Sequence, residues 1–210
     1  MSLADWLDIS QTEGHGDASV AVGSKGYHTG RLNRQTVITW VAADVAPIER
    51  TVIQQGRGPM STFKSRSTSV SYKGARIKLT GVSNEKYLTF ALGDGDLLLN
   101  MPQTYIAAGV EMPTKMAVPG TGSEIGIPGD PGASNAYDFS ITFDVPENVG
   151  ERQTRQVIAQ NPDKTYSAIC TIISTPNEAY VEIPEGDIIL DHMGTPVTIE
   201  VKSNTAWEIV

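Results

Sequence analysis

The stretch Gly194-Thr-Pro-Val-Thr-Ile-Glu-Val-Lys-Ser-Asn-Thr-Ala-Trp207 repeats the pattern of Gly74-Ala-Arg-Ile-Lys-Leu-Thr-Gly-Val-Ser-Asn-Glu-Lys-Tyr87 without a gap, at an offset of 120 residues. In both copies apolar residues alternate with polar ones, which is typical of a half-buried antiparallel strand. Each copy then has Ser-Asn, followed three residues later by an aromatic ring. We infer that the two stretches are the same strand in two related structural units.

A second match extends the repeat over the chain. Val20 and Val22 align with Ile141 and Phe143 at an offset of 121 residues, and Arg34-Gln35 aligns with Arg155-Gln156. The two units are out of frame with the ends of the chain. The sequence therefore predicts the following organisation: a complete domain at 67–175, with an insertion at about 93–135, a second domain split between 1–55 and 181–210, and a linker at 56–66.

Composition and pattern predict an all-β fold. Hydrophobic residues make up 40% of the 210 residues, which is enough for two modest cores. Short strand-like runs are separated by clusters of Gly, Pro, Asn and Asp, as in β-sandwiches. These runs are 19–22, 36–40, 51–53, 77–79, 139–143, 169–173 and 197–201. We expect two immunoglobulin-like β-sandwich domains, one of them split between the chain termini.

The charge balance bears on the choice of partner. The formal net charge of −8 argues against a general nucleic-acid binder. Basic residues nevertheless gather between Glu49 and Glu85, and Arg57, Lys64 and Arg66 are among them. One interpretation is a solvated sheet edge, since edge strands use Lys to block aggregation. The other is a docking strip for an acidic neighbour, such as a second copy of this chain. No apolar run is long enough to predict a membrane span.

The order of motifs across the split unit resembles the BACON domain, an immunoglobulin-like β-sandwich frequent in Bacteroidetes. Read from 194 through 210 and on from residue 1, the chain has a Gly turn, an alternating strand, Ser-Asn-Thr before a Trp, and a Trp-Leu pair. A Gly-rich turn, another alternating strand and an Arg turn follow. The matching residues are Gly194, Val197, Ile199, Val201, Trp207, Trp6, Leu7, Gly14, Val20, Val22, Arg34, Val37, Val52 and Gln54. In the middle unit Tyr87 replaces the first Trp, and the insertion interrupts the Trp-Leu site.

The resemblance implies two functions. The family was proposed to bind carbohydrate, and it also occurs in virion proteins of tailed phages that infect Bacteroidetes, including crAss-like phages. The start of the chain lacks the basic and apolar segments of a secretion signal. The expectation is therefore a non-enzymatic virion protein, assembled in the host cytoplasm, such as a capsid auxiliary (decoration) protein or a neck, tail or fibre component. Its partners would be other virion proteins or copies of itself. The alternative is a carbohydrate-binding module for host or mucin glycans.

The sequence offers no catalytic, cofactor-binding or metal-binding residues. His15, His28 and His192 lack the spacing of metal ligands. Asp94-Gly-Asp96 resembles the start of a calcium loop, but Tyr105 stands where that loop needs a bidentate Glu. We therefore expect a non-enzyme with no cofactor. Among the Trp residues, Trp6 and Trp207 fit core positions, and Trp40 is the candidate for stacking on a glycan.

The insertion supplies the remaining candidate contacts. A long loop inside a compact domain is often a binding segment. This one carries apolar residues that could meet a partner subunit, namely Leu97, Leu98, Leu99, Met101, Ile106, Val110, Met112 and Met116. The alternative is a hairpin that packs on its own sandwich.

The split domain can close in two ways. Val181, Ile183, Ile188, Leu190, Val197, Ile199, Val201 and Trp207 are expected to bury against Leu7, Ile9, Val20, Val22, Val37 and Val52. These two sets can meet within one chain, giving a circularly permuted monomer. They can also meet between two copies, by exchange of strands. The sequence leaves both open.

Overall fold

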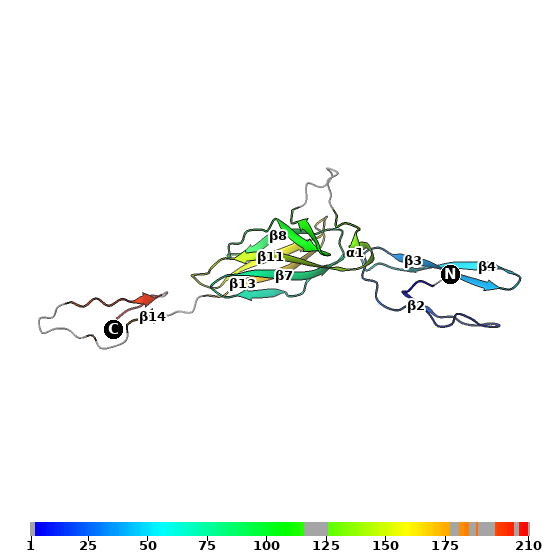
Figure 1. Ribbon diagram of the computed structural model, residues 1–210, viewed down its shortest axis with the longest axis horizontal. Coiled ribbons are helices and arrows are strands. Elements are labelled where there is room, and N and C mark those ends of the chain that lie inside the picture. Colours follow the sequence, from blue (N-terminus) through cyan, green and yellow to red (C-terminus); the bar gives the residue numbers. More distant parts are fainter. Residues whose placement is uncertain are drawn as a thin grey trace.

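The computed structural model describes residues 3–115, 126–176, 181–184, 188, 196–203 and 206–209. Strands dominate it, and the one helix among these residues is α1 (Pro131–Ser134), so the predicted all-β class is confirmed. A β-sandwich occupies the centre (Figure 1). Strands before it and after it in the sequence lie beyond its two opposite ends.

The central sandwich has two sheets. The five-stranded sheet has the order β10-β9-β11-β7-β5, and the four-stranded sheet has the order β6-β13-β12-β8. The strands of the first are β5 (Ser61–Phe63), β7 (Ala75–Ser83), β9 (Thr104–Ala107), β10 (Val110–Pro113) and β11 (Tyr137–Val145). Those of the second are β6 (Ser67–Val70), β8 (Thr89–Gly95), β12 (Gln153–Gln160) and β13 (Ser167–Ser174).

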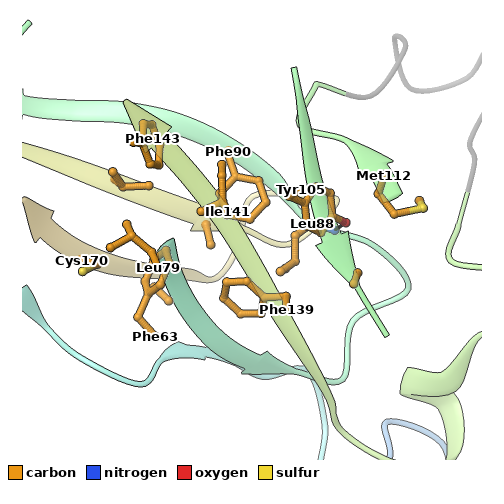
Figure 2. Packing of buried hydrophobic residues seen from close by; sticks show 14 of the residues in the cluster. Phe63, Leu79, Leu88, Phe90, Tyr105, Met112, Phe139, Ile141, Phe143 and Cys170 are labelled. Atoms are coloured by element: carbon orange, nitrogen blue, oxygen red, sulfur yellow. Dashed lines mark hydrogen bonds between the residues drawn. The ribbon is translucent and has the colours of Figure 1, made fainter. Parts of the chain in front are cut away.

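β11 organises the core because its alternation places Phe139, Ile141 and Phe143 on the inner face. It pairs with β7 over nine residues, from Tyr137↔Ser83 to Val145↔Ala75. Figure 2 shows the three side chains pointing into the core, among residues of both sheets. The ring of Phe139 also lies edge-on to Phe63, with 5.4 Å between centroids.

Two boundaries differ from the sequence prediction. The predicted linker 56–66 contains β5, which pairs with β7 from Ser61↔Ser83 to Phe63↔Gly81. Phe63 is 7% exposed, and its burial is what draws this stretch into the sheet. The insertion expected at about 93–135 begins inside β8, and part of it forms the β9–β10 hairpin, which extends the five-stranded sheet beside β11.

The flanking segments form small separate ribbons. On the N-terminal side, β1 (Leu7–Ile9) pairs with β2 (Val22–Ser24), and β3 (Arg34–Ala42) pairs with β4 (Val45–Gln54). On the C-terminal side, β14 (Val181–Glu182) pairs with β15 (Lys202–Ser203). Figure 1 shows β14 and the strands β2, β3 and β4 beyond opposite ends of the sandwich. Among the described residues, neither ribbon set pairs with the other.

Substitution of two neighbouring leucines in the insertion tests the packing of this segment. Leu97 is 1% exposed, whereas Leu98 is 79% exposed. Leu97→Ala should lower the free energy of unfolding by about 2–5 kcal/mol, because it leaves a cavity in the core. Leu98→Ala should change it by less than about 0.5 kcal/mol. Urea unfolding of both variants measures the difference, and equal losses would contradict the packing described here.

Candidate functional site

The C-terminal ribbon repeats a strand pair of the sandwich. In β14–β15 the residues Val181 and Ser203 face each other. In β5–β7 the residues Ser61 and Ser83 do so. Val181 follows Ser61 by 120 residues, and Ser203 follows Ser83 by the same number, so the two pairs have the same register. The pair β14–β15 therefore repeats two paired positions of β5–β7, at the edge of the five-stranded sheet.

The sequence repeat relates the N-terminal strands to other strands of the central sandwich. By the repeat, β3–β4 corresponds to β12–β13, since Arg34-Gln35 matches Arg155-Gln156 and each pair lies in the first strand of an antiparallel ribbon. β2 corresponds to β11, since Val22 matches Phe143. β11 has neighbours on both edges, β9 on one and β7 on the other. Among the residues that the structure describes, β2 pairs with β1 alone.

A groove lies within the N-terminal unit. It encloses about 520 Å³ between the two N-terminal ribbons. Its lining comes from Ile9 of β1 and the segments that flank β1 on one side, and from residues 38–41 of β3 on the other. The apolar side chains in it are Leu3, Ile9, Ala18, Val20, Ile38, Trp40 and Val41. Leu7 and Ile38 are the two large apolar side chains of this unit that are fully covered, at 4% and 7% exposure.

The apolar residues of the C-terminal segment are likewise uncovered. Ile199 is 40% exposed, Trp207 is 50% exposed and Val197 is 52% exposed. We expected them to bury against the N-terminal set, yet Val20, Val22 and Val37 are exposed as well. The structure thus does not bring the two sets together within one chain. Ile183 and Ile188 are exposed too, while Leu190 lies outside the described residues.

Polar contacts hold the two N-terminal layers over each other. The guanidinium of Arg34 in β3 lies 4.7 Å from the centroid of the Trp6 ring, next to β1. Its Nε donates to Gln54 Oε1 at 2.9 Å. Gln54 in turn donates through Nε2 to Ser24 Oγ in β2 at 3.0 Å. These contacts join the two ribbons away from the groove lining and so fix the position of one ribbon relative to the other.

A junction joins the N-terminal unit to the sandwich. Arg31 forms an ion pair with Asp130 at 2.6 Å, and its Nη1 donates to the backbone oxygen of Asn84 at 2.6 Å. Asn84, which is fully buried, donates to the carbonyls of Thr29 and Gly58 and accepts from the N–H of Met60. A buried amide with all of these partners fixes the geometry around it.

Close backbone packing adds to the junction. A Cβ on Gly30 would lie 2.4 Å from the Ser134 backbone, and one on Gly132 would lie 2.2 Å from Asn84 O. Glycine is therefore required at both positions. Burial raises the pKa of Glu85, against the opposing effect of the nearby Arg31 charge. The sequence pattern did not predict this junction. The repeated Ser-Asn pair, here Ser83-Asn84, was the feature of the sequence that pointed to a structural role for Asn84.

The predicted partner contacts of the insertion do not form one exposed patch. Leu97 and Met112 are buried in the core, so their assignment as surface contacts is wrong. Leu99 and Met101 are half-buried and pack against the same core. Leu98, Ile106 and Val110 are exposed, and Met116 lies outside the described residues. The hairpin alternative explains the buried members, because β9 and β10 complete the sheet.

The basic residues are also separate. Arg57 is exposed next to the junction, where its N–H donates to Gly30 O at 2.9 Å. Lys64 pairs with Asp138 at 2.7 Å on the surface of the sandwich. Arg66 is exposed at the entry to β6. Lys64 thus already has an acidic neighbour within the chain.

Trp40 lies in the groove and is 42% exposed. Among the described residues, no group of three His, Cys, Asp or Glu side chains is placed to hold a metal ion. His28 is buried, with Nε2 2.6 Å from Leu32 O in the junction, and His15 is exposed. His192 lies outside the described residues. No helix in the described part of the chain is long and apolar enough to cross a membrane.

Comparison with known proteins gives no family. No family model matches the chain, and no curated protein matches it. Among solved structures, an endo-fucoidan hydrolase of glycoside hydrolase family 107 aligns with 83% of this chain and 22% of its own, at 11% identity and a TM-score of 0.31. The C-terminal domain of the Streptococcus agalactiae AgI/II polypeptide BspA aligns with 59% of this chain and 52% of its own, at 10% identity and a TM-score of 0.34.

A third structure, the CooA pilin subunit of enterotoxigenic Escherichia coli, aligns with 57% of this chain and 98% of its own, at 14% identity and a TM-score of 0.27. The chain spans about a fifth of the hydrolase and about half of the adhesin domain. At TM-scores of 0.34 or less, these similarities carry no argument about the function of this chain. The functional argument rests on the groove and the exposed strands.

Two cationic residues test the junction. Arg31→Ala should loosen the N-terminal unit, because it leaves Asp130 and the Asn84 carbonyl without their charged donor, at a cost of about 1–3 kcal/mol. Lys64→Ala removes an exposed pair and should cost less than about 1 kcal/mol. Limited proteolysis between residues 55 and 60 reports the loosening. If the two variants are cut at the same rate, Arg31 does not hold the units together.

Proposed function

We propose that this protein is a non-enzymatic structural subunit that acts through protein–protein contacts, chiefly between its own copies. One observation carries the proposal: segments with exposed apolar residues, such as Val20 and Ile199, lie beyond opposite ends of the central sandwich in the same molecule. Apolar strands left unpaired favour association with a matching surface. Each molecule then has one site at either end, as a building block requires.

The setting we propose is the virion of a tailed bacteriophage. The support is the resemblance to the BACON domain in the split unit, which includes Trp6-Leu7 and Trp207. The subunit would be a capsid auxiliary protein or a neck, tail or fibre component, assembled in the host cytoplasm. Its other partners would be neighbouring virion proteins that meet the exposed residues of the sandwich, such as Leu98.

Glycan binding is the second candidate, and Trp40 favours it. Its ring is 42% exposed in the groove, and the polar residues Gln11, Thr12 and Glu13 line the same groove. An aromatic face beside hydrogen-bonding groups is the usual composition of a sugar site. On this reading Trp40→Ala abolishes binding to mucin glycans, whereas Tyr27→Ala, which removes a fully exposed ring outside the groove lining, does not.

Self-association is the measurement that decides between them. Light scattering after size-exclusion chromatography should show oligomers whose mass grows with protein concentration, and electron microscopy should show rows or rings of subunits. The expected cause is burial of the exposed strands, at about 25 cal/mol per Å² of apolar surface. A protein that stays monomeric at every concentration, and binds mucin glycans through Trp40, would overturn the structural role.

A further inference from the structure

We propose that residues 196–203 of one copy add as a strand to the free edge of β2 in a second copy and close its N-terminal sandwich. This inference rests on the proposed structural function and names the contact that carries it. The occupant of the groove edge is thus the C-terminal segment of an identical chain. Its ribbon partner β14 comes with it, as β5 accompanies β7 in the central sandwich.

The central sandwich gives the register. In β11–β7 the pairs Ile141↔Leu79 and Phe143↔Ile77 lie opposite each other in antiparallel strands. Through the two offsets of the repeat, Ile141 corresponds to Val20 and Leu79 to Ile199. Phe143 corresponds to Val22 and Ile77 to Val197. The expected intermolecular pairs are therefore Val20↔Ile199 and Val22↔Val197.

The backbone of β2 is ready for this pairing. Ala21, directly before β2, donates its N–H to Ser10 Oγ at 2.9 Å and accepts from the Ser10 N–H at 3.0 Å, on the β1 side. Since hydrogen bonding alternates along an antiparallel strand, the backbone groups of Val22, the first residue of β2, point to the other edge. The added strand would extend this alternation to Val20.

The central sandwich shows the same alternation. Asp138 accepts from Ala108 on the β9 side of β11. The next residue, Phe139, therefore directs its backbone groups to β7. Phe139 lies in phase with Ile141 and Phe143, which are the counterparts of Val20 and Val22. The free edge of β2 thus presents its donors and acceptors in the phase that a strand equivalent to β7 requires.

Side chains fit the same arrangement. Ile141 and Leu79 are 1% and 3% exposed where they meet in the central core. Their counterparts Val20 and Ile199 are 36% and 40% exposed. Pairing Val20 with Ile199 buries both, together with the apolar lining of the groove. It also gives Trp207 a core to enter, as Tyr87 does at 4% exposure.

The positions of the two connections favour closure between copies over closure within one chain. Thr175 lies at the start of β7, because it donates to Val70 O and accepts from Asn148, whose N–H donates to Tyr72 O. The N-terminal unit is attached at the other end of β7, through Asn84. The nine residues of β7 cover about 30 Å.

The connector is shorter than this gap. Four residues separate Pro176 from Val181, so the Cα atoms of these two residues lie at most about 18 Å apart. Val181 remains paired with Ser203, so β15 stays within a strand width of the end of the connector. In the structure the ribbon lies beyond the end of the sandwich opposite to β2 (Figure 1), where the β2 edge of another copy is accessible to it.

The contact is heterologous, because it joins residues 196–203 of one copy to β2 of another. Each copy can therefore accept a strand from one neighbour and donate its own strand to a second neighbour. The product is a row in which complete sandwiches alternate with sandwiches closed by exchange. Such a row grows until it closes into a ring or meets a surface that limits it. This property suits a structural subunit with sites at both ends.

Paired cysteines test the register. Ala21 and Thr198 are exposed and correspond to Thr142 and Lys78, which face each other in β11–β7. Opposite positions bring Cβ atoms to the 4.5–5.5 Å range, close enough for a disulfide after a small shift. Under oxidation, a full-length chain with Ala21→Cys and Thr198→Cys should give a ladder of linked oligomers on a non-reducing gel. Mixing the two single variants should give linked dimers only.

The matched control moves one cysteine by two residues. Ala21→Cys with Glu200→Cys places the pair on a diagonal about 7–8 Å apart, so its cross-linking should fall at least about tenfold. The native Cys170 is 1% exposed, so the wild-type chain should remain unlinked. A faster-migrating monomer with an internal disulfide would overturn the exchange. Equal yields from both pairs would overturn the register.

A second pair of variants separates this contact from assembly in general. Ile199→Asp puts a charge into the expected interface and should weaken self-association at least about tenfold. Thr198→Asp, on the outward face, should leave it within about threefold. Oligomers that survive Ile199→Asp would support the structural function and overturn the strand exchange. A wild-type chain that forms no oligomers and no cross-links would overturn both.

Discussion

The antiparallel pairing of β7 with β11 is the interaction on which the rest of the molecule depends. It brings two strands that are far apart in the sequence into a nine-residue ladder and directs Phe139, Ile141 and Phe143 into one core. β5 and β9 then attach to its two edges. The same pair of strands occurs twice in the sequence, but the chain brings the two members together in the central sandwich alone, among the residues described. The second pair stays apart, with one member at each end.

The contacts at the junction decide where the N-terminal unit lies relative to the C-terminal segment. Asn84, Arg31 and Asp130 tie the N-terminal unit to one end of β7 through charged and buried hydrogen bonds. The C-terminal segment leaves from the other end, beside Asn148. Two open edges therefore point away from each other along the molecule. A flexible joint would let the parts fold back, whereas a fixed one favours contact with another copy.

The groove between the N-terminal ribbons accounts for both functional candidates. Its walls are held apart by the Trp6–Arg34 stack and by Gln54. Apolar residues such as Val20 suit a strand that buries them, and Trp40 suits a ring-shaped ligand. A strand supplies backbone hydrogen bonds to β2 as well as side chains, and a sugar supplies neither a ladder nor a core. We therefore place assembly first and glycan binding second.

Local pattern was enough to predict the all-β class, because several strand-like runs alternate apolar and polar residues with period two, such as those at 77–79 and 197–201. The repeat also led to the prediction that one unit is split between the chain termini. Pattern could not place Leu97 and Met112, since an apolar residue in a loop-like stretch looks the same whether it meets its own core or a partner. It could not find the Arg31–Asp130 pair either, because the two residues are 99 positions apart. Only the tertiary structure decided that the split halves lie at opposite ends of one molecule, since this depends on which end of β7 each connection leaves from.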